Sequence, residues 1–259
     1  MIPNGDLSFQ MFSSRAAENL EEQISVLAEL GYTDVQPFFF GPPEDMASLE
    51  SYSALLKRYG LTAKSGHFTL DLFEDAPDLV TAIARRFGMW LVVCPWIAPE
   101  DRPQTVAGWK ALGDRLARLT DLMAARGLTF AYHNHDFEMH PLPDGSYPIE
   151  HLLGDRVPFE PDLAWMVVGG ADPLVWLDRY RGRIPAVHVK DLAPEGTALD
   201  ERGFADLGHG ILDWQSLWDA AVASGSQLMI VEHDQPSDWR RFARRSIETM
   251  RAIGRGTEA

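Results

Sequence analysis

A glycine followed by a short β-prone run recurs along this chain, and an amphipathic stretch precedes it each time. Glycine ends helices well because it adopts the left-handed backbone conformation without steric cost. A helix that ends in glycine and leads into a buried strand is half of a βα unit. The glycines that open these runs are Gly31, Gly60, Gly88, Gly127, Gly182 and Gly225.

Two further runs, 7–12 and 157–165, raise the number of predicted strands from six to eight. Apolar residues at three- and four-residue spacing predict helices between them, as over 18–30. Because no Ser- or Pro-rich linker interrupts the pattern, we predict an α/β fold, a single (β/α)8 TIM barrel over residues 1–259. A doubly wound sheet is the alternative, but it more often has a glycine-rich first turn, which is absent after 7–12.

The run Leu128–Glu138, LTFAYHNHDFE, concentrates titratable groups at the end of one predicted strand. Side chains alternate between the faces of a strand, so Ala131, His133 and His135 share one side and Tyr132 lies on the other. A small and polar face opposite a bulky face is typical of a barrel strand. The histidine side would then open into the barrel mouth, although a buried strand with structurally satisfied histidines is the alternative.

The active site of a TIM barrel lies at the C-terminal ends of its strands. Imidazoles and carboxylates crowd the last four predicted ends, at His133, His135, Glu138, Glu160, Asp162, His188, Lys190, Glu232 and His233. The earlier strands end near Gln10, Gln36, His67 and Trp96. Strand parity selects Asp162, His188 and Glu232 as inward groups, with a fourth from His133 or Glu138. Such a set suits Mn²⁺, Co²⁺, Fe²⁺ or Zn²⁺ better than Ca²⁺, whereas ion pairs or caps are the alternative for each residue alone.

Charge and composition exclude some classes of protein. The formal net charge of −15 argues against a non-specific nucleic-acid binder, which needs a basic surface. No apolar run approaches the length of a membrane span, and the single cysteine excludes an internal disulfide. We therefore expect a cytoplasmic protein with no nucleic-acid or membrane partner, and with homo-oligomerisation as an option.

The same segments resemble the xylose isomerase-like TIM-barrel superfamily, in its sugar phosphate isomerase/epimerase branch. The resemblance covers nearly the whole chain and rests on LSFQMFSSR, YHNHDFE, DLAW with GGADP, HVKDL, DLGHGILDW and VEHD. It implies a metal held by Glu, Asp, His and Glu from four strands, the last three matching Asp162, His188 and Glu232. His133 occupies the position that is Glu in many relatives, and Glu138 is the nearest carboxylate. We favour Glu138 as the fourth ligand because a third carboxylate keeps the charge balance, and the reverse assignment stays open.

The resemblance implies a metal-dependent isomerase or epimerase with a small-molecule carbohydrate substrate, acting through an enediolate on a keto-sugar or related polyol. Mn²⁺ is the preferred ion, with Co²⁺, Fe²⁺, Mg²⁺ or Zn²⁺ as alternatives. Glu232 or His133 would move the proton, and Lys190 would bind an anionic group or polarise the carbonyl. If the group β to the carbonyl can leave, the same site would instead serve a lyase or hydratase acting on a 3-keto-glycoside or keto-sugar. A barrel that only binds a sugar, and an endonuclease of the related abasic-site type, are further interpretations, the latter disfavoured by charge.

Residues around the expected mouth are candidates to contact substrate. The predicted contacts are His67, His135 and Trp96, and further aromatic candidates are Trp165, Phe39 and Phe68, for which core or lid packing is the alternative. The segment 191–212 is long for a βα loop, and Gly203, Gly208 and Gly210 within it would act as hinges. It is predicted to form a lid that excludes water, with a disordered insertion as the alternative.

Overall fold

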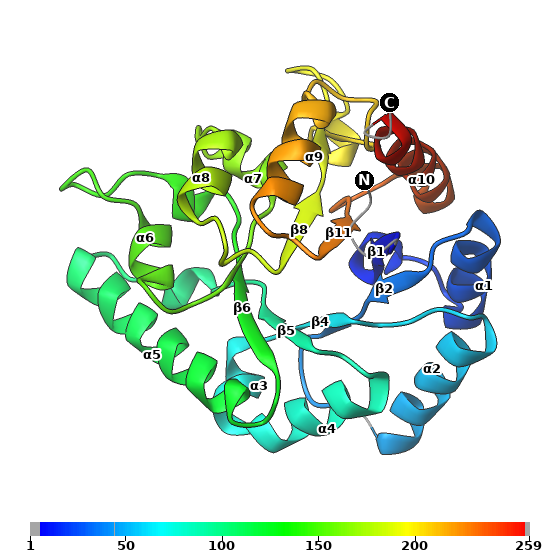
Figure 1. Cartoon of the computed structure of the whole chain (residues 1–259), viewed down its shortest axis with the longest axis horizontal. Coiled ribbons are helices and arrows are strands. Elements are labelled where there is room, and N and C mark those ends of the chain that lie inside the picture. Colours follow the sequence, from blue (N-terminus) through cyan, green and yellow to red (C-terminus); the bar gives the residue numbers. More distant parts are fainter. Residues whose placement is uncertain (1–5, 44, 257–259) are drawn as a thin grey trace.

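The computed structural model describes residues 6–43 and 45–256, which form a TIM barrel with parallel strands at the centre and helices around them (Figure 1). The predicted barrel is confirmed, whereas the single domain over 1–259 stays a prediction. The barrel strands are β1 (Ser8–Gln10), β2 (Asp34–Gln36), β3 (Phe38–Phe39), β4 (Ser65–Phe68), β5 (Leu91–Cys94), β6 (Thr129–His133), β7 (Phe159–Glu160), β8 (Ala186–Val189) and β11 (Leu228–Val231).

The strands pair in parallel around the ring. The order is β2-β1-β11-β8 on one side and β3-β4-β5-β6-β7 on the other. Isolated bridges from Asp34 to Thr62 and from Asp162 to His188 connect the two sides. All C-terminal strand ends therefore open on the same rim, which brings together residues that are distant in sequence.

The helices lie outside the strands (Figure 1). They are α1 (Leu20–Leu30), α2 (Met46–Arg58), α3 (Leu70–Asp75), α4 (Pro77–Phe87), α5 (Val106–Ala124), α6 (Pro148–Leu153), α7 (Leu163–Val168), α8 (Pro173–Arg179), α9 (Trp214–Ala223) and α10 (Trp239–Gly256). Short 3-10 helices are η2 (Met11–Ser14), η3 (Pro99–Asp101), η4 (Phe137–Met139) and η5 (Leu199–Glu201). Gly31 and Gly88 have φ values of 90° and 78°, so they end α1 and α4 in the predicted left-handed conformation. Within the described ranges, no helix combines the length and apolarity needed to cross a membrane.

The barrel interior changes from apolar to polar along the strands. One buried apolar layer contains Leu91, Val93, Ala131, Ala186, Leu228 and Ile230. The alternate side chains, such as Phe130 and Tyr132, pack in a separate and larger core between the strands and the helices. The predicted parity of the His133 strand is therefore confirmed, and the polar layer lies next to the rim.

Two segments differ from the sequence expectation. The strand predicted over 157–165 is only two residues long, because α7 begins at Leu163 with Asp162 as its N-cap. Instead of a disordered insertion, the segment 191–212 contains a small antiparallel ribbon, β9 (Asp191–Leu192) paired with β10 (Phe204–Ala205), and the helix η5 lies between these strands. We call residues 191–212 the lid segment.

Candidate metal centre and active site

Four strand ends bring four potential metal ligands together at the barrel mouth. One ligand atom from each of His133, Asp162, His188 and Glu232 lies within 4.8 Å of the others, and all four residues are buried. These residues lie in or just after β6, β7, β8 and β11, so the cluster depends on closure of the barrel. We call these four residues the ligand cluster.

Glu160, two residues before Asp162 on the same face, lies one layer deeper and contacts several imidazoles. Its Oε1 atom lies 2.7 Å from His67 Nε2 and 3.1 Å from His188 Nε2. The same oxygen lies 3.5 Å from His133 Nδ1. Gln36 Nε2 donates a hydrogen bond to the other carboxylate oxygen at 3.0 Å. A single buried carboxylate therefore links three imidazole rings, two of which belong to the ligand cluster.

Lys190 is a buried cation beside the ligand cluster. Its Nζ atom lies 2.8 Å from Asp162 Oδ2 and 2.8 Å from Glu232 Oε2. A third carboxylate, Asp234, lies 2.5 Å from the same nitrogen through Oδ1. Burial by itself lowers the pKa of Lys190, but these carboxylates outweigh it and raise the pKa above its usual value. Lys190 is therefore an ammonium ion that partly balances the acidic groups.

Local hydrogen bonds set the orientation of Asp162. Asn134 Oδ1 accepts from the backbone N–H of Asp162 at 2.9 Å, and Asp162 Oδ1 accepts from Trp165 N at 2.9 Å. The first contact holds the backbone at the end of β7, and the second caps α7. Because Oδ1 is used by the cap, Oδ2 is the oxygen that faces Lys190. Burial raises the pKa of Asp162 to about 6.

The structure does not bring Glu138 into the ligand cluster. Tyr132 Oη donates to Glu138 Oε1 at 2.6 Å, and the backbone N–H of His135 donates to Oε2 at 2.8 Å. Tyr132 is on the helix-facing side of β6, so these bonds hold the Glu138 carboxylate behind the strand. The fully buried carboxylate has its pKa raised to about 7 by burial. In this structure His133, and not Glu138, lies in the ligand cluster, and which of the two residues binds the ion stays a prediction.

The two cluster imidazoles have opposite electrostatic environments. His188 lies with Nδ1 2.9 Å from Glu232 Oε2 and with Nε2 2.7 Å from Gln36 Oε1. Burial lowers its pKa, but Glu160 and Glu232 outweigh burial and raise the pKa to about 10. For His133, burial and the neighbouring His188 hold the pKa well below its usual value. His133 is therefore neutral, which is the form that binds a metal ion.

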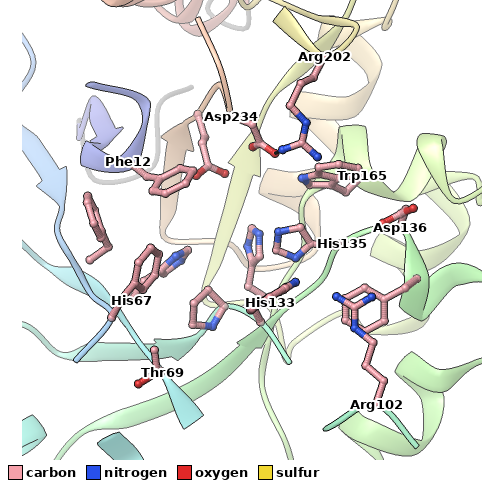
Figure 2. Close-up of a pocket in the computed structure, with 16 residues that line it drawn as sticks. Phe12, His67, Thr69, Arg102, His133, His135, Asp136, Trp165, Arg202 and Asp234 are labelled. Atoms are coloured by element: carbon pink, nitrogen blue, oxygen red, sulfur yellow. Dashed lines mark hydrogen bonds and ion pairs between the residues drawn. The ribbon is translucent and has the colours of Figure 1, made fainter. Parts of the chain in front are cut away.

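A pocket of about 660 Å³ opens above the ligand cluster (Figure 2). The predicted contacts His67, His135 and Trp96 all line it, as does Trp165. The aromatic candidates Phe39 and Phe68 do not. Their rings stack on each other with centroids 4.8 Å apart in the core, so the alternative of core packing holds for both residues.

The lid segment contributes an arginine to this pocket. Arg202 has a positive φ of 59° and follows η5. Its guanidinium NH1 lies 3.5 Å from Asp234 Oδ2, and the group lies over the ring of Trp165 at 5.5 Å (Figure 2). Since Asp234 also contacts Lys190, the lid segment is connected by charge to the floor of the pocket.

The chemistry of the ligand cluster fits a divalent ion. Two neutral or deprotonatable imidazoles and two carboxylates are a donor set that binds transition metals of this class. Among the residues described, His133 Nδ1 is a buried nitrogen without a hydrogen bond, and Glu160 Oε1 lies 3.5 Å from it. Such unsatisfied buried atoms are costly unless an ion or water pairs with them. The barrel and the ligand cluster together define this protein as a divalent-metal-dependent TIM-barrel enzyme.

Comparison with known proteins identifies the family of this chain. A family model described as xylose isomerase-like TIM barrel matches residues 24–253. The chain therefore belongs to the xylose isomerase-like TIM-barrel family.

Curated relatives of this chain include dehydratases. Inosose dehydratase of Lacticaseibacillus casei is 28% identical over 154 residues, which are 52% of this chain and 51% of that protein. Inosose dehydratase of Geobacillus kaustophilus (strain HTA426) is 28% identical over 225 residues, 74% of this chain and 68% of that protein. The chain thus spans about half the length of the first relative and about two thirds of the second.

Solved structures share the fold. A sugar phosphate isomerase/epimerase from Parabacteroides distasonis has a TM-score of 0.78 at 21% identity, with 95% of this chain and 93% of that chain covered. The IolI protein, solved with a zinc atom, has a TM-score of 0.72 at 16% identity, with 96% and 97% covered. A xylose isomerase-like protein from Mycobacterium smegmatis, solved with magnesium, has a TM-score of 0.70 at 15% identity, with 98% and 97% covered.

Several residues of the site received no role from the sequence. Glu160 and Gln36 were recognisable only as polar residues at strand ends, although the parity of Glu160 with Asp162 indicated an inward position. Asp234 follows β11, and Arg202 lies in the lid segment. In neither place does a sequence period predict the direction of a side chain. Their positions become apparent only from tertiary contacts.

Proposed function

We propose that this protein is a metal-dependent carbon–oxygen lyase that dehydrates a cyclic keto-polyol such as an inosose or a keto-sugar. The observation that carries the proposal is the buried ligand cluster with Lys190 and the imidazole of His135 beside it, in a chain whose curated relatives include inosose dehydratases. An isomerase or epimerase would remove the same proton beside the carbonyl. It would then return a proton to the substrate, whereas the lyase releases water. We further propose Mn²⁺ as the resident ion.

We assign the ion to His133, Asp162, His188 and Glu232. Because His188 Nε2 is hydrogen-bonded on the side of Gln36 and Glu160, its Nδ1 atom beside Glu232 is the better ligand atom. A divalent ion there supplies Lewis acidity, which makes a proton next to a bound carbonyl easier to remove. The side chains supply the remaining steps.

Proton removal is assigned to Glu232. It lines the pocket, and Lys190 with His188 holds its pKa well below the usual value despite burial, so it is ionised and able to accept a proton. The ammonium group of Lys190 is positioned to stabilise negative charge that develops on the substrate oxygen. The carbon–hydrogen bond beside the carbonyl breaks, and its electron pair forms a carbon–carbon double bond.

Departure of the neighbouring hydroxyl completes the reaction. The carbon–oxygen bond breaks with its electron pair going to the oxygen, and the hydroxyl leaves as water with the proton that Glu232 removed from the carbon. We assign proton exchange with this hydroxyl to His135, which lines the pocket and has a buried Nδ1 atom without a partner among the described residues. Burial lowers the pKa of His135 to about 4, so its imidazole is neutral at neutral pH. It is therefore suited to pass a proton on without remaining protonated.

Mass spectrometry in D₂O separates the two reactions. The Mn²⁺-loaded protein is incubated with scyllo-inosose and with 3-keto-glucose, and substrate mass is followed over time. A dehydratase releases water from the substrate, whereas an epimerase retains all atoms and exchanges one carbon-bound hydrogen for deuterium. Deuterium exchange without loss of water would overturn the lyase assignment in favour of the epimerase. The chelator-treated protein and Asp162→Asn are the controls, and both are expected to be inactive.

A further inference from the structure

Three phenylalanine side chains form one wall of the pocket. Phe12 lies in η2 after β1, whereas Phe38 and Phe40 lie in and directly after β3. Their ring centroids are 4.9 to 5.8 Å apart, so the three rings form one contiguous surface. Figure 2 shows Phe12 on the side of the pocket away from Arg102 and Trp165. We call Phe12, Phe38 and Phe40 the phenylalanine wall.

The pocket is larger than one polyol ring requires. A six-membered polyol ring has about a dozen non-hydrogen atoms and needs at most about 360 Å³, even at the roughly 30 Å³ that each water occupies in the liquid. The pocket encloses about 660 Å³. A ring placed at the ligand cluster therefore leaves nearly half of the volume for another group.

The phenylalanine wall has the chemistry of a surface that a ligand covers. Phe40 is 57% exposed although it lies in a pocket, and exposed large apolar groups in clefts typically mark binding sites. The guanidinium of Arg15 lies over the ring of Phe12 at 3.7 Å, a cation–π contact that favours this orientation of the ring. The ligand cluster already supplies the polar contacts that a polyol needs, so the wall is suited to an apolar group attached to it.

We propose that the phenylalanine wall is a second subsite, which binds an aromatic ring linked to the keto-polyol, as in an aryl keto-glycoside. The proposal rests on the proposed function for the reacting ring, and it adds the class of group that the substrate carries. Aromatic rings pack on one another in edge and offset geometries, which the angled phenylalanine rings provide. The preferred substrate of this protein is then a two-ring compound, and a free monocyclic keto-polyol such as an inosose occupies only the part of the pocket at the ligand cluster.

Paired glycosides test the subsite. Binding of phenyl β-D-glucopyranoside and methyl β-D-glucopyranoside to the Mn²⁺-loaded protein is measured by isothermal titration calorimetry, since neither compound has the keto group needed for reaction. Burial of a phenyl ring against apolar side chains predicts about 10- to 100-fold tighter binding of the phenyl compound. Equal affinity for both compounds would overturn the proposal, whatever the outcome of the dehydration assay with inosose.

Variants of the wall locate the effect. Phe40→Ala removes an exposed ring and is expected to fold normally, and it should abolish most of the preference for phenyl over methyl. Val175→Ala is the matched control, because Val175 is 59% exposed on α8 and does not line the pocket. An equal loss of affinity for both glycosides in Phe40→Ala would show that the wall stacks on the polyol ring itself and would overturn the aromatic subsite.

Discussion

The two sides of the barrel mouth differ in nearly every physical property. On the side of β6, β7, β8 and β11, carboxylates, imidazoles and the Lys190 ammonium are buried and joined by contacts of 2.5 to 3.5 Å. On the side of β1 and β3, the phenylalanine wall contributes no ionisable group and leaves Phe40 largely exposed. The first side holds its groups in one arrangement, whereas the second presents a surface to be covered.

This difference shows that catalytic groups and groups that select the substrate lie on opposite sides of the barrel mouth. Reacting groups need fixed positions and shifted protonation states, and burial among opposite charges provides both. To prefer a substrate that carries an apolar substituent, the pocket needs an apolar surface of matching shape, which exposed aromatic rings at the rim provide. Substitutions on the charged side should therefore affect turnover of every substrate, while substitutions in the phenylalanine wall should alter preference among substrates.

The largest effect is expected from Asp162→Asn. The amide retains an oxygen to cap α7, so the fold is preserved, but the cluster loses a negatively charged ligand. We expect most of the bound metal and all measurable turnover to be lost. Elemental analysis of the purified variant checks this expectation. Asp172→Asn makes the same change at the N-cap of α8, away from the ligand cluster, and should retain metal. Parent-like metal content in Asp162→Asn would show that the ion binds elsewhere.

Glu232→Gln separates proton transfer from metal binding on the charged side. The amide can still offer an oxygen to the ion but cannot accept a proton at neutral pH. Turnover should fall at least about a hundredfold, the usual scale for loss of a general base, while metal occupancy falls modestly. Steady-state rates with increasing Mn²⁺ provide the measurement. If excess Mn²⁺ restores full activity, Glu232 is a ligand only and another residue is the base.

Glu160→Gln tests whether the deeper carboxylate orients the ligand imidazoles. Groups that hydrogen-bond to metal-binding histidines typically contribute about 10- to 100-fold to metal affinity. We expect a loss in that range by calorimetric titration with Mn²⁺, because the acceptor that His188 and His133 share loses its negative charge. Glu150→Gln on α6, remote from the mouth and paired with Arg179, is the control. An affinity equal to that of the parent would mean that Gln36 alone orients His188.

The smallest effect on the metal site is expected from Glu138→Gln, whose carboxylate lies behind β6. Metal affinity should stay near that of the parent, and a large loss would restore Glu138 as a ligand. The substitution should instead change how the free energy of unfolding depends on pH. Burial raises the pKa of Glu138 from 4.5 to about 7, so the folded protein keeps a proton that the unfolded chain releases. The parent should therefore lose stability as pH rises from about 4.5 to 7, and the variant should lose less over this window. Urea unfolding of both metal-free proteins at several pH values provides the measurement.

Local sequence patterns determined the barrel and the inward residues. Glycine at helix ends and short β-prone runs predicted the alternation of helices and strands, because left-handed caps and strand propensity depend on a few neighbouring residues. Parity predicted that Ala131 and His133 face inward while Tyr132 faces the helices, because strand side chains alternate irrespective of the rest of the fold. The same rule selected Asp162, His188 and Glu232, which the structure brings together.

Only the tertiary structure decided which groups meet beyond the ends of the strands. Glu138 is five residues from His133, and its distance from the ion site depends on a hydrogen bond to Tyr132 that no spacing predicts. Glu160 contacts His67 and His188 because barrel closure places β4, β7 and β8 around one axis. Sequence patterns report the direction of a side chain on its own element. Long-range packing of different elements sets the contacts between their side chains, and those contacts determine the ligands, the charges and the shape of the pocket.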